Sequence, residues 1–152
     1  MKGITIWQPW AQLLVTGIKK NETRSWQTHY RGEILIHAAK QNPLRGMEMI
    51  SDAAWKKALI SLGLHNNLDP IEQFPTGVIV GKAKLVDCRQ IDDRLIQSLS
   101  AEELAYGDFT PGRYAWVMED PEVFKQPIPA KGKQGLWNWD LKEEMDGHEN
   151  YY

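Results

Sequence analysis

Residues 6–26 read IWQPWAQLLVTGIKKNETRSW, and this stretch changes structural type twice. The preceding GITIW, at residues 3–7, predicts a first β-strand that runs into it. Pro9 suits the first position of a short helix and Gly17 the position just past its end. The alternating ETRSW at 22–26 predicts a second extended segment. The stretch therefore predicts strand, helix and strand in close succession. The buried face of the helix is expected to carry Trp10, Leu13 and Leu14.

The middle of the chain predicts both strand and helix. GEILIHA, at residues 32–38, has the composition of a strand, and residues 43–62 show helical periodicity ended by Gly63. NNLDPIEQFP, at 66–75, is typical of a loop. The longest strand signal is TGVIVGKAKLVDC at 76–88, where Gly81 predicts a bulge that bends the strand.

The last part of the chain contributes a helix and two strands. SLSAEELAYG at 98–107 contains a capping box, with Ser100 as the cap and Glu103 three residues later. GRYAWVME at 112–119 predicts a strand. A proline-bounded loop and a final short strand are expected in QPIPAKGKQGLWNWD at 126–140. Strands of mixed length with inserted helices, lacking a regular βαβ rhythm, predict an α+β fold. We expect a small, partly open mixed β-barrel with flanking helices.

Length and charge favour one domain without a strong global field. The 152 residues predict a single domain over 1–140, followed by an acidic and flexible tail at 141–152. The net charge of −2 gives no global attraction to nucleic acid, so any contact with phosphate requires a local patch. No run approaches membrane-spanning length. Cys88 is the only cysteine, so no internal disulfide is possible, which suits a reducing cytoplasm. We expect a cytoplasmic monomer.

A cluster of charged residues beside a tryptophan stands out in the second extended segment. Side chains two residues apart in a strand share a face, so Glu22, Arg24 and Trp26 are predicted to project together. Lys19 lies just before them and is expected to lean over the same face. The indole offers a stacking surface, and the guanidinium offers paired donors to a phosphate, carboxylate or base edge. The alternative is a simple Glu22–Arg24 ion pair on a solvated strand.

Other chemical signals are weaker. His37 is interpreted as a hydrogen-bonded structural residue. No two histidines have metal-ligand spacing, and no phosphate-binding loop or dinucleotide fingerprint occurs, so neither a metal nor a cofactor is expected. The basic, glycine-rich PAKGKQG at 129–135 has two interpretations, a phosphate-binding loop or an exposed turn. Glu103 has a capping role that would explain its presence.

Together, TIWQPWAQLLVTGIKKNETRSW, YRGEILIHAAK, GRYAWVME and PIPAKGKQGLWNW resemble an ASCH domain of the PUA-like superfamily. The G-x-K-x-x-E-x-R signature of that family is matched by Gly17, Lys19, Glu22 and Arg24. The resemblance implies a small β-barrel with a cleft beside the signature, and an association with RNA or modified nucleosides. It also implies possible hydrolase activity, since some ASCH proteins resemble amidohydrolases acting on N4-acetylcytidine and ribonuclease activity has been attributed to others.

Two functional hypotheses follow, with an adaptor surface for a protein partner as a third. In the first, the chain binds RNA or a modified nucleoside through a set of seven residues: Lys19, Glu22, Arg24, Trp26, Lys40, Arg113 and Lys131. In the second it is a hydrolase that uses Lys19, Glu22 and Arg24, together with an acid that the sequence leaves open among Asp87, Glu102, Glu103 and Asp108. The amidohydrolase branch has a threonine where this chain has Glu22, and alternation is expected to turn Thr23 to the opposite face. A covalent threonine mechanism is therefore disfavoured, and binding is preferred to catalysis.

Overall fold

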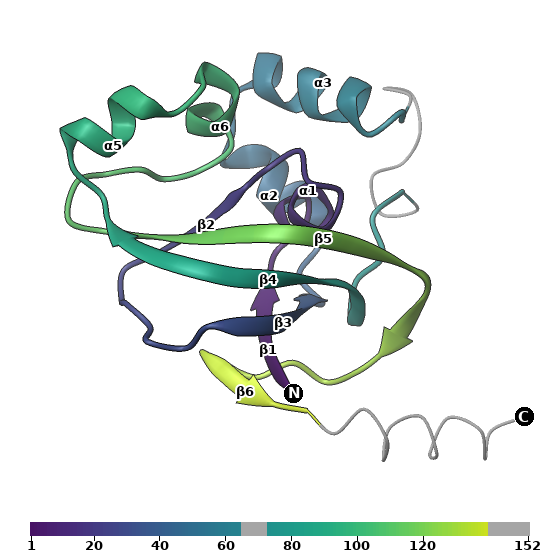
Figure 1. Ribbon diagram of the computed structural model, residues 1–152. Helices are drawn as coiled ribbons and strands as arrows, with labels where there is room; N and C mark the ends of the chain where they lie inside the picture. The colour runs from purple at the N-terminus through teal and green to yellow at the C-terminus, as the bar shows by residue number, and fades with distance from the viewer. Residues whose placement is uncertain (65–72, 140–152) are drawn as a thin grey trace, which may run out of the picture.

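The computed structural model describes residues 1–64 and 73–139. Within them one mixed sheet has the strand order β2-β5-β4-β3-β1-β6 (Figure 1). Only β1 and β3 pair in parallel; the other neighbours are antiparallel. The strands are β1 (Lys2–Ile6), β2 (Asn21–Arg24), β3 (Gly32–Ala38), β4 (Val78–Gln90), β5 (Tyr114–Pro129) and β6 (Leu136–Asn138).

Helices flank this sheet, as expected. Figure 1 shows α3, α5 and α6 gathered at one end of the molecule and β6 at the other. The short α1 packs against the sheet, where it contacts β3, β4 and β5. The helices are α1 (Trp10–Val15), α2 (Pro43–Glu48), α3 (Asp52–Ser61), α5 (Asp93–Ser98) and α6 (Ala101–Ala105). The predicted α+β fold with a partly open barrel is thereby confirmed.

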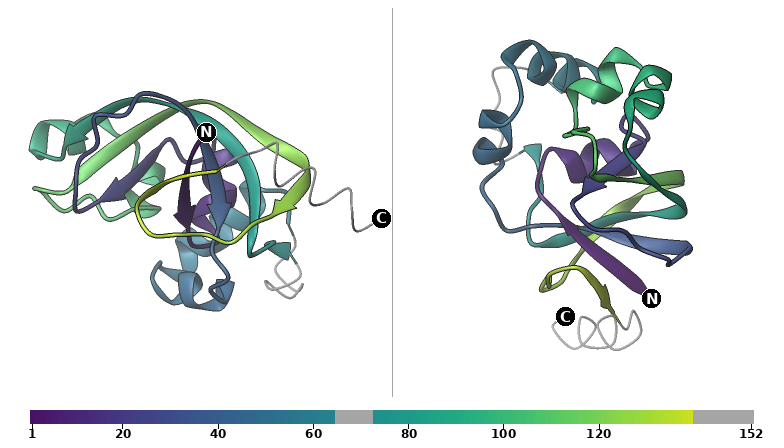
Figure 2. Two further views of the ribbon diagram at one scale, coloured as in Figure 1. Left: turned by 90° about the horizontal axis from the view of Figure 1, so that it is seen from below. Right: turned by 90° about the vertical axis from the view of Figure 1, so that its left-hand side faces the viewer.

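The long strands β4 and β5 curve, as the two views of Figure 2 show. The predicted bulge lies at Gly81: Ile36 pairs with Gly81 and His37 with Ile79, so Val80 is an extra residue in β4. A Cβ on Gly81 would lie 2.1 Å from the carbonyl oxygen of Glu122. Glycine is needed here because the β5 backbone approaches too closely for any side chain.

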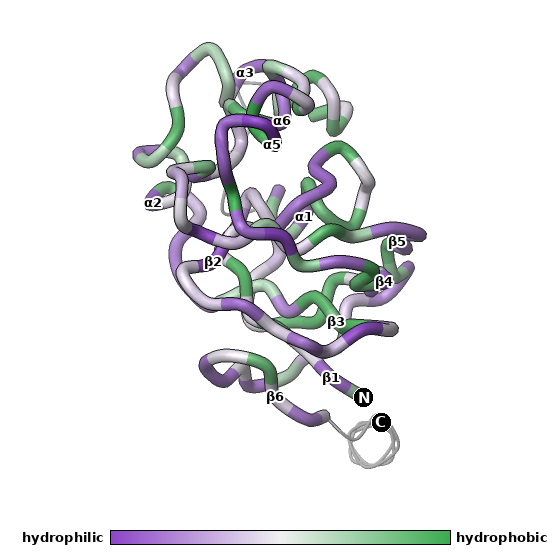
Figure 3. The backbone as a smooth tube through the Cα atoms, turned by 60° about the vertical axis from the view of Figure 1, so that its left-hand side comes forward, coloured by the Kyte–Doolittle hydropathy of each residue, from purple (hydrophilic) through white to green (hydrophobic). Residues whose placement is uncertain are grey.

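The core fills the space between α1 and the sheet. Figure 3 shows hydrophobic stretches in β3 and β4, whereas β2 is hydrophilic. Ile4, Ile34, Ile36, Leu85 and Trp116 are fully buried in one cluster. Burying a side chain of this size contributes about 1.5–3 kcal/mol, so these strands hold the scaffold together.

The sequence was wrong about the extent of several elements. Residues 43–62 form two helices, because the Ser51 hydroxyl accepts from the Ala54 amide at 3.2 Å and starts α3 as a new helix. Helix α5 was not predicted. Strand β5 continues through Pro129, where a loop was expected. Prolines are tolerated there because β2 pairs only with residues 114–117 of β5, which leaves the outer edge free of a ladder.

Two other predictions lie largely or wholly outside the described residues. The loop at 66–75 is described only from residue 73, and the tail at 141–152 not at all. In the part that is described, no helix is long and apolar enough to cross a membrane.

Candidate functional site

Three cavities adjoin the signature segment. One, of about 450 Å³, is lined by Gly17, Lys19 and Lys20 among others, and the other two contain the remaining signature residues. The larger of these two, which we call the large cavity, has a volume of about 1270 Å³. The residues in it that bear on ligand binding are Trp7, Arg24, Trp26, Lys40, Lys131 and Lys133. The smaller, which we call the lysine cavity, has a volume of about 240 Å³ and is lined by Lys19, Glu22, Thr23 and Asp108, among others.

The large cavity is cationic and aromatic. Four of its lining residues are lysine or arginine, and none of the fifteen, all within the described ranges, is aspartate or glutamate. Its two tryptophans, Trp7 and Trp26, are 39% and 37% exposed, which is unusual for so large an apolar side chain. The surface therefore combines stacking faces with a local positive charge that the net charge of the chain conceals.

Arg24 is held in place by contacts on both sides. Its Nη2 donates to the carbonyl oxygen of Thr5 at 2.9 Å and to Oε2 of Glu22 at 3.1 Å. Thr5 belongs to β1, next to the far edge of the sheet, whereas Arg24 lies on the edge strand β2. The guanidinium thus bridges the open side of the half-barrel while lining the large cavity.

Trp26 is oriented from behind by Trp116. Their rings meet edge to face, with centroids 4.7 Å apart and planes at 89°. The Trp116 indole also donates to the carbonyl oxygen of Trp26 at 3.2 Å. Because Trp116 is fully buried, this contact fixes the exposed indole on a rigid support.

His37 forms part of the wall of the large cavity. Its Nε2–H donates to the carbonyl oxygen of Ala130 at 2.7 Å, which places the lone pair of the neutral ring on Nδ1. Nδ1 is buried and has no hydrogen-bond partner among the described residues. Burial lowers the pKa of this imidazole, and the bond to Ala130 only partly offsets that effect. The interpretation of His37 as a hydrogen-bonded residue therefore agrees with its geometry, although sequence reasoning did not place it at a cavity.

Lys19 is enclosed rather than exposed. It is 2% exposed, its ammonium donates to the carbonyl oxygen of Asn21, and Nζ lies 3.7 Å from Oε2 of Glu103. The ring of Phe109 lies 5.6 Å from Nζ. Desolvation lowers the pKa of Lys19, and the negative charges of Glu22 and Glu103 oppose that shift. The side chain is a buried cation supported by carboxylates.

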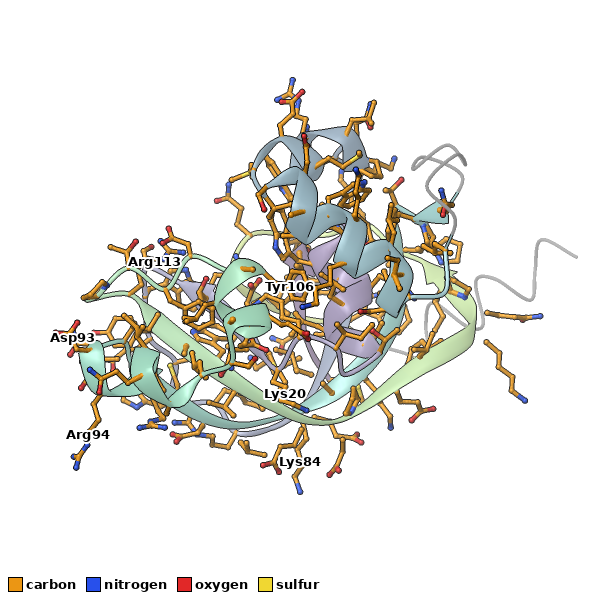
Figure 4. The ribbon with its side chains drawn as sticks, turned by 90° about the horizontal axis from the view of Figure 1, so that it is seen from above. Lys20, Lys84, Asp93, Arg94, Tyr106 and Arg113 are labelled. Atoms are coloured by element: carbon orange, nitrogen blue, oxygen red, sulfur yellow. The ribbon has the colours of Figure 1, made fainter. Side chains whose placement is uncertain are left out.

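Glu103 does more than cap its helix. The Ser100 hydroxyl accepts from the Glu103 amide at 3.1 Å, so half of the capping box forms. The Glu103 carboxylate turns away from the cap and accepts from the amides of Lys20, at 2.9 Å, and Asn21, at 3.2 Å. In Figure 4 Lys20 lies close to α6, whereas Asp93 and Arg94 point outward from α5. The carboxylate therefore ties α6 to the start of β2.

The predicted binding residues are divided between the large cavity and the lysine cavity. Arg24, Trp26, Lys40 and Lys131 meet in the large cavity, while Lys19 and Glu22 line the lysine cavity. Arg113 lines neither: it donates to the carbonyl oxygen of Thr23 at 3.3 Å and lies 3.5 Å from Asp108. The division falls between Glu22 and Arg24, although both lie in β2 and the Arg24 guanidinium donates to Glu22 at 3.1 Å. Trp26, which follows the end of β2, shares the large cavity with Arg24.

Thr23 lines the same cavity as Glu22, although alternation along the strand is expected to turn the two side chains to opposite faces. Because β2 is an edge strand, a hollow alongside it can be reached from both of its faces.

Among the four candidate acids, three lie at or near the surface. Asp87 is 3.8 Å from Arg31, and Glu102 pairs with Lys57 at 2.9 Å, both in exposed positions. Asp108 lines the lysine cavity but is itself largely exposed. Glu103 is therefore the only one of the four that is buried next to Lys19. Across the described residues, no three His, Cys, Asp or Glu side chains are grouped so as to hold a metal ion.

Comparison with protein families gives one match that covers most of the chain. The family model described as "ASCH domain" matches residues 4–128. Activating signal cointegrator 1 from Homo sapiens is 28% identical over 140 residues, covering 91% of this chain and 22% of the human protein. The Mus musculus protein of the same name is 27% identical over 139 residues, with the same coverage. The chain thus spans about a fifth of the length of these relatives.

Solved structures agree on the fold. The crystal structure of ASCH from Zymomonas mobilis superimposes with a TM-score of 0.57 at 18% identity, covering 98% of this chain and 93% of that one. A mutant form of the same protein gives a TM-score of 0.54 at 19% identity, with 98% and 96% covered. At these identities the likeness establishes the architecture alone.

Proposed function

Because the chain belongs to the ASCH-domain family, a PUA-like fold, we propose that it binds single-stranded RNA in the large cavity. The observation that carries the proposal is the composition of that cavity: two exposed tryptophans and four cationic side chains, with no acidic residue among those that line it. The chain as a whole has a net charge of −2, whereas the lining of the large cavity carries only positive charges.

The binding mode follows from these groups. Trp7 and Trp26, which both line the cavity, offer ring faces on which unstacked bases can lie, a contact that contributes about 1–3 kcal/mol per base. Arg24 offers donors to a base edge or phosphate. The lysines neutralise phosphate groups of the RNA backbone. Double-stranded RNA presents its bases stacked and paired, so the exposed indoles favour a single strand.

The test is a titration of short single-stranded RNAs, followed by fluorescence anisotropy of a labelled strand. Trp26→Ala is expected to weaken binding by about 5–150-fold, the equivalent of one lost stacking contact. Four neutralised phosphates would give a slope of log K against log salt of about −3. Lys84→Ala is the control for a surface cation outside the cavity, because Lys84 is exposed on β4 and lines neither cavity.

Two results would contradict the proposal. One is wild-type protein that binds neither RNA nor nucleosides at low salt. The other is a Trp26→Ala variant that loses affinity only in proportion to a lower melting temperature, which would make the indole a structural residue.

The lysine cavity favours a second candidate function, hydrolysis of an acylated nucleoside. Lys19 has a lowered pKa and lines this cavity with Glu22, which suits proton transfer to or from a bound water. Its volume of about 240 Å³ lies below the usual range for ligand pockets, so it would admit only part of a nucleoside. Binding is preferred, because the Lys19 ammonium already donates to Asn21 and faces Glu103.

Turnover of N4-acetylcytidine, measured by separating it from cytidine, tests the second function. Glu22→Gln keeps the size of the side chain and removes the carboxylate base, so activity should fall by about 10²–10⁴-fold while the fold persists. Wild-type protein that leaves acylated nucleosides intact would eliminate this function without affecting the first.

A further inference from the structure

We propose that Lys40, Lys131 and Lys133 form a phosphate site in the large cavity, so that its ligand is a nucleotide and not a neutral nucleoside. The inference rests on the proposed function, whose cavity it shares. It goes beyond general neutralisation of an RNA backbone, because it places one particular phosphate at the basic, glycine-rich segment at 131–135.

The segment is anchored at its start. The Ala130 amide donates to the carbonyl oxygen of Gly77 at 3.3 Å, and the Ala130 carbonyl oxygen accepts from His37 Nε2–H at 2.7 Å. The first bond reaches the residue before β4, and the second reaches β3. Both backbone groups of Ala130 are thus tied to the sheet immediately before Lys131.

Gly132 fixes the next part of the segment. A Cβ at this position would lie 2.6 Å from Nδ1 of His37 and 2.6 Å from Oγ1 of Thr5, closer than real Cβ atoms come. Thr5 Oγ1 is itself held, since it accepts from the Trp137 indole at 3.1 Å. Glycine therefore lets the backbone settle against the sheet, and the lysines on either side of it line the cavity.

Lys40 reaches the same place from another segment. A Cβ on Gly77 would lie 3.1 Å from Cγ and 3.3 Å from Cε of Lys40, so the aliphatic stem lies across the glycine. Gly77 also has a φ of 70°, a backbone conformation that disfavours other residues. Because Gly77 carries the Lys40 stem and bonds to Ala130, the lysine and the segment share one anchor.

Three ammonium groups from two anchored segments suit a phosphate. Lysine acts as a compact point charge toward phosphate oxygens, without the planar geometry that a guanidinium requires. His37 lines the cavity as a neutral ring, since burial lowers its pKa, and adds no positive charge. The other titratable groups on this wall are Arg24 and the three lysines. A ligand that uses both features has a base to stack on an indole and a phosphate to contact the lysines, and is therefore a nucleotide.

The test compares ligands that differ only by phosphate. Cytidine and adenosine, their 5′- and 3′-monophosphates, inorganic phosphate, and RNA hexamers with and without a terminal phosphate are titrated into the full chain by calorimetry. The Lys131→Gln/Lys133→Gln variant keeps both backbone anchors and removes two charges. Lys84→Gln, which removes one charge from an exposed lysine that lines neither cavity, is the control.

In the wild type and the control, a monophosphate should bind at least about tenfold more tightly than its nucleoside, the equivalent of one charge-assisted hydrogen bond. The double variant should lose most of that advantage. Equal affinity for nucleoside and monophosphate in the wild type would overturn the phosphate site, and so would an advantage that survives in the double variant. The hexamers show whether the site takes a terminal or an internal phosphate. If it takes a terminal phosphate, the hexamer that carries one should bind more tightly than the hexamer without it; if it takes an internal phosphate, the two should bind equally.

Failure of this inference is separable from failure of the proposed function. RNA binding that depends on Trp26, without any phosphate preference, would refute the phosphate site alone. A monophosphate preference without RNA binding would refute RNA binding alone.

Gly132→Ala supplies an independent check on geometry. The added Cβ should displace the segment and reduce the phosphate preference, while stacking on Trp26 persists. Thermal melting shows whether the variant remains folded, and a folded variant with a full preference would contradict the proposed role of Gly132.

Discussion

Replacing Glu103 with alanine is expected to destabilise the fold strongly, although the residue lies on a short surface helix. Its carboxylate accepts from two backbone amides, at 2.9 and 3.2 Å, and is the nearest anion to the buried ammonium of Lys19. Hydrogen bonds to a charged group contribute about 1.5–3 kcal/mol each. Removing one partner of a buried ion pair costs about 3–5 kcal/mol. These terms overlap, so the free energy of unfolding should fall by about 3–5 kcal/mol in total.

Urea denaturation followed by tryptophan fluorescence measures this loss. In thermal melts, it corresponds to a decrease of about 6–20 °C for a domain of this size. Glu102→Ala is the matched control, on the same helix and with the same charge. Glu102 pairs with Lys57 in an exposed position, and such pairs contribute little, so the control should unfold almost like the wild type.

A double-mutant cycle separates the ion pair from the amide contacts. With Lys19 already replaced by methionine, Glu103→Ala should cost about 0.5–3 kcal/mol less than in the wild type, the usual coupling of contacting residues. The reasoning is refuted if the cost of Glu103→Ala does not depend on residue 19, or if Glu102→Ala is equally damaging.

Three further results are expected. Gly46→Ala should lower the melting temperature despite the gain of about 1 kcal/mol in helix propensity, because the new Cβ would lie 2.1 Å from the carbonyl oxygen of Gln8; a variant that melts at the wild-type temperature would contradict this close approach. The pKa of Lys19 in the folded protein is lowered from about 10.5, so between the lowered value and 10.5 the unfolded chain binds more protons than the folded one. The free energy of unfolding of the wild type should therefore rise with pH relative to that of Lys19→Met, and urea titrations at pH 7 to 10 would measure this rise. Arg24→Met should reduce stability by about 1–3 kcal/mol and weaken RNA binding as well, because the guanidinium both links β2 to β1 and lines the large cavity; Arg94→Met, on the exposed part of α5, should do neither.

Local patterns were sufficient to predict most of the secondary structure. GEILIHA forms β3 over the predicted residues, and Gly81 marks the bulge in β4. These succeed because alternation and glycine punctuation act over a few residues. The helix predicted at 43–62 failed because apolar periodicity continues through the break, whereas the Ser51 cap that starts α3 depends on a single hydroxyl.

The candidate site was less predictable, because it depends on residues far apart in sequence. Arg24 and Trp26 were grouped from their spacing. Lys40 and Lys131 were also predicted as binding residues, although they follow β3 and β5 and no local pattern joins them to Arg24. Trp7 and His37 carried no local signal for a cavity. Lys133 lies within PAKGKQG, which the sequence singled out as a possible phosphate-binding loop. Sheet topology brings these segments together, and pattern alone does not specify topology.

Glu103 has a long-range role that its place in a capping box does not indicate. The capping box predicted that its carboxylate would return to its own helix, and this prediction was wrong. The carboxylate instead binds a segment more than eighty residues earlier in the chain. The capping rule still places the backbone correctly, since Ser100 caps α6. The Glu103 carboxylate binds these distant amides instead of its own helix because the amides at the start of β2 are buried and need an acceptor.

The signature residues therefore contribute both to the stability of the fold and to the candidate sites, and a measured loss of activity would not separate these two contributions. Lys19 and Glu22 line the lysine cavity, to which hydrolysis is assigned as the second candidate function. Lys19 is also a buried cation whose removal leaves Glu103 without its nearest opposite charge. Arg24 closes the open side of the half-barrel and lines the large cavity at the same time. Trp26, which is supported by Trp116 and is 37% exposed, should affect ligand binding when replaced with less effect on folding than Lys19 or Arg24. A variant at Lys19 that loses function is informative about chemistry only after its free energy of unfolding has been measured, whereas a variant at Trp26 reports on binding directly.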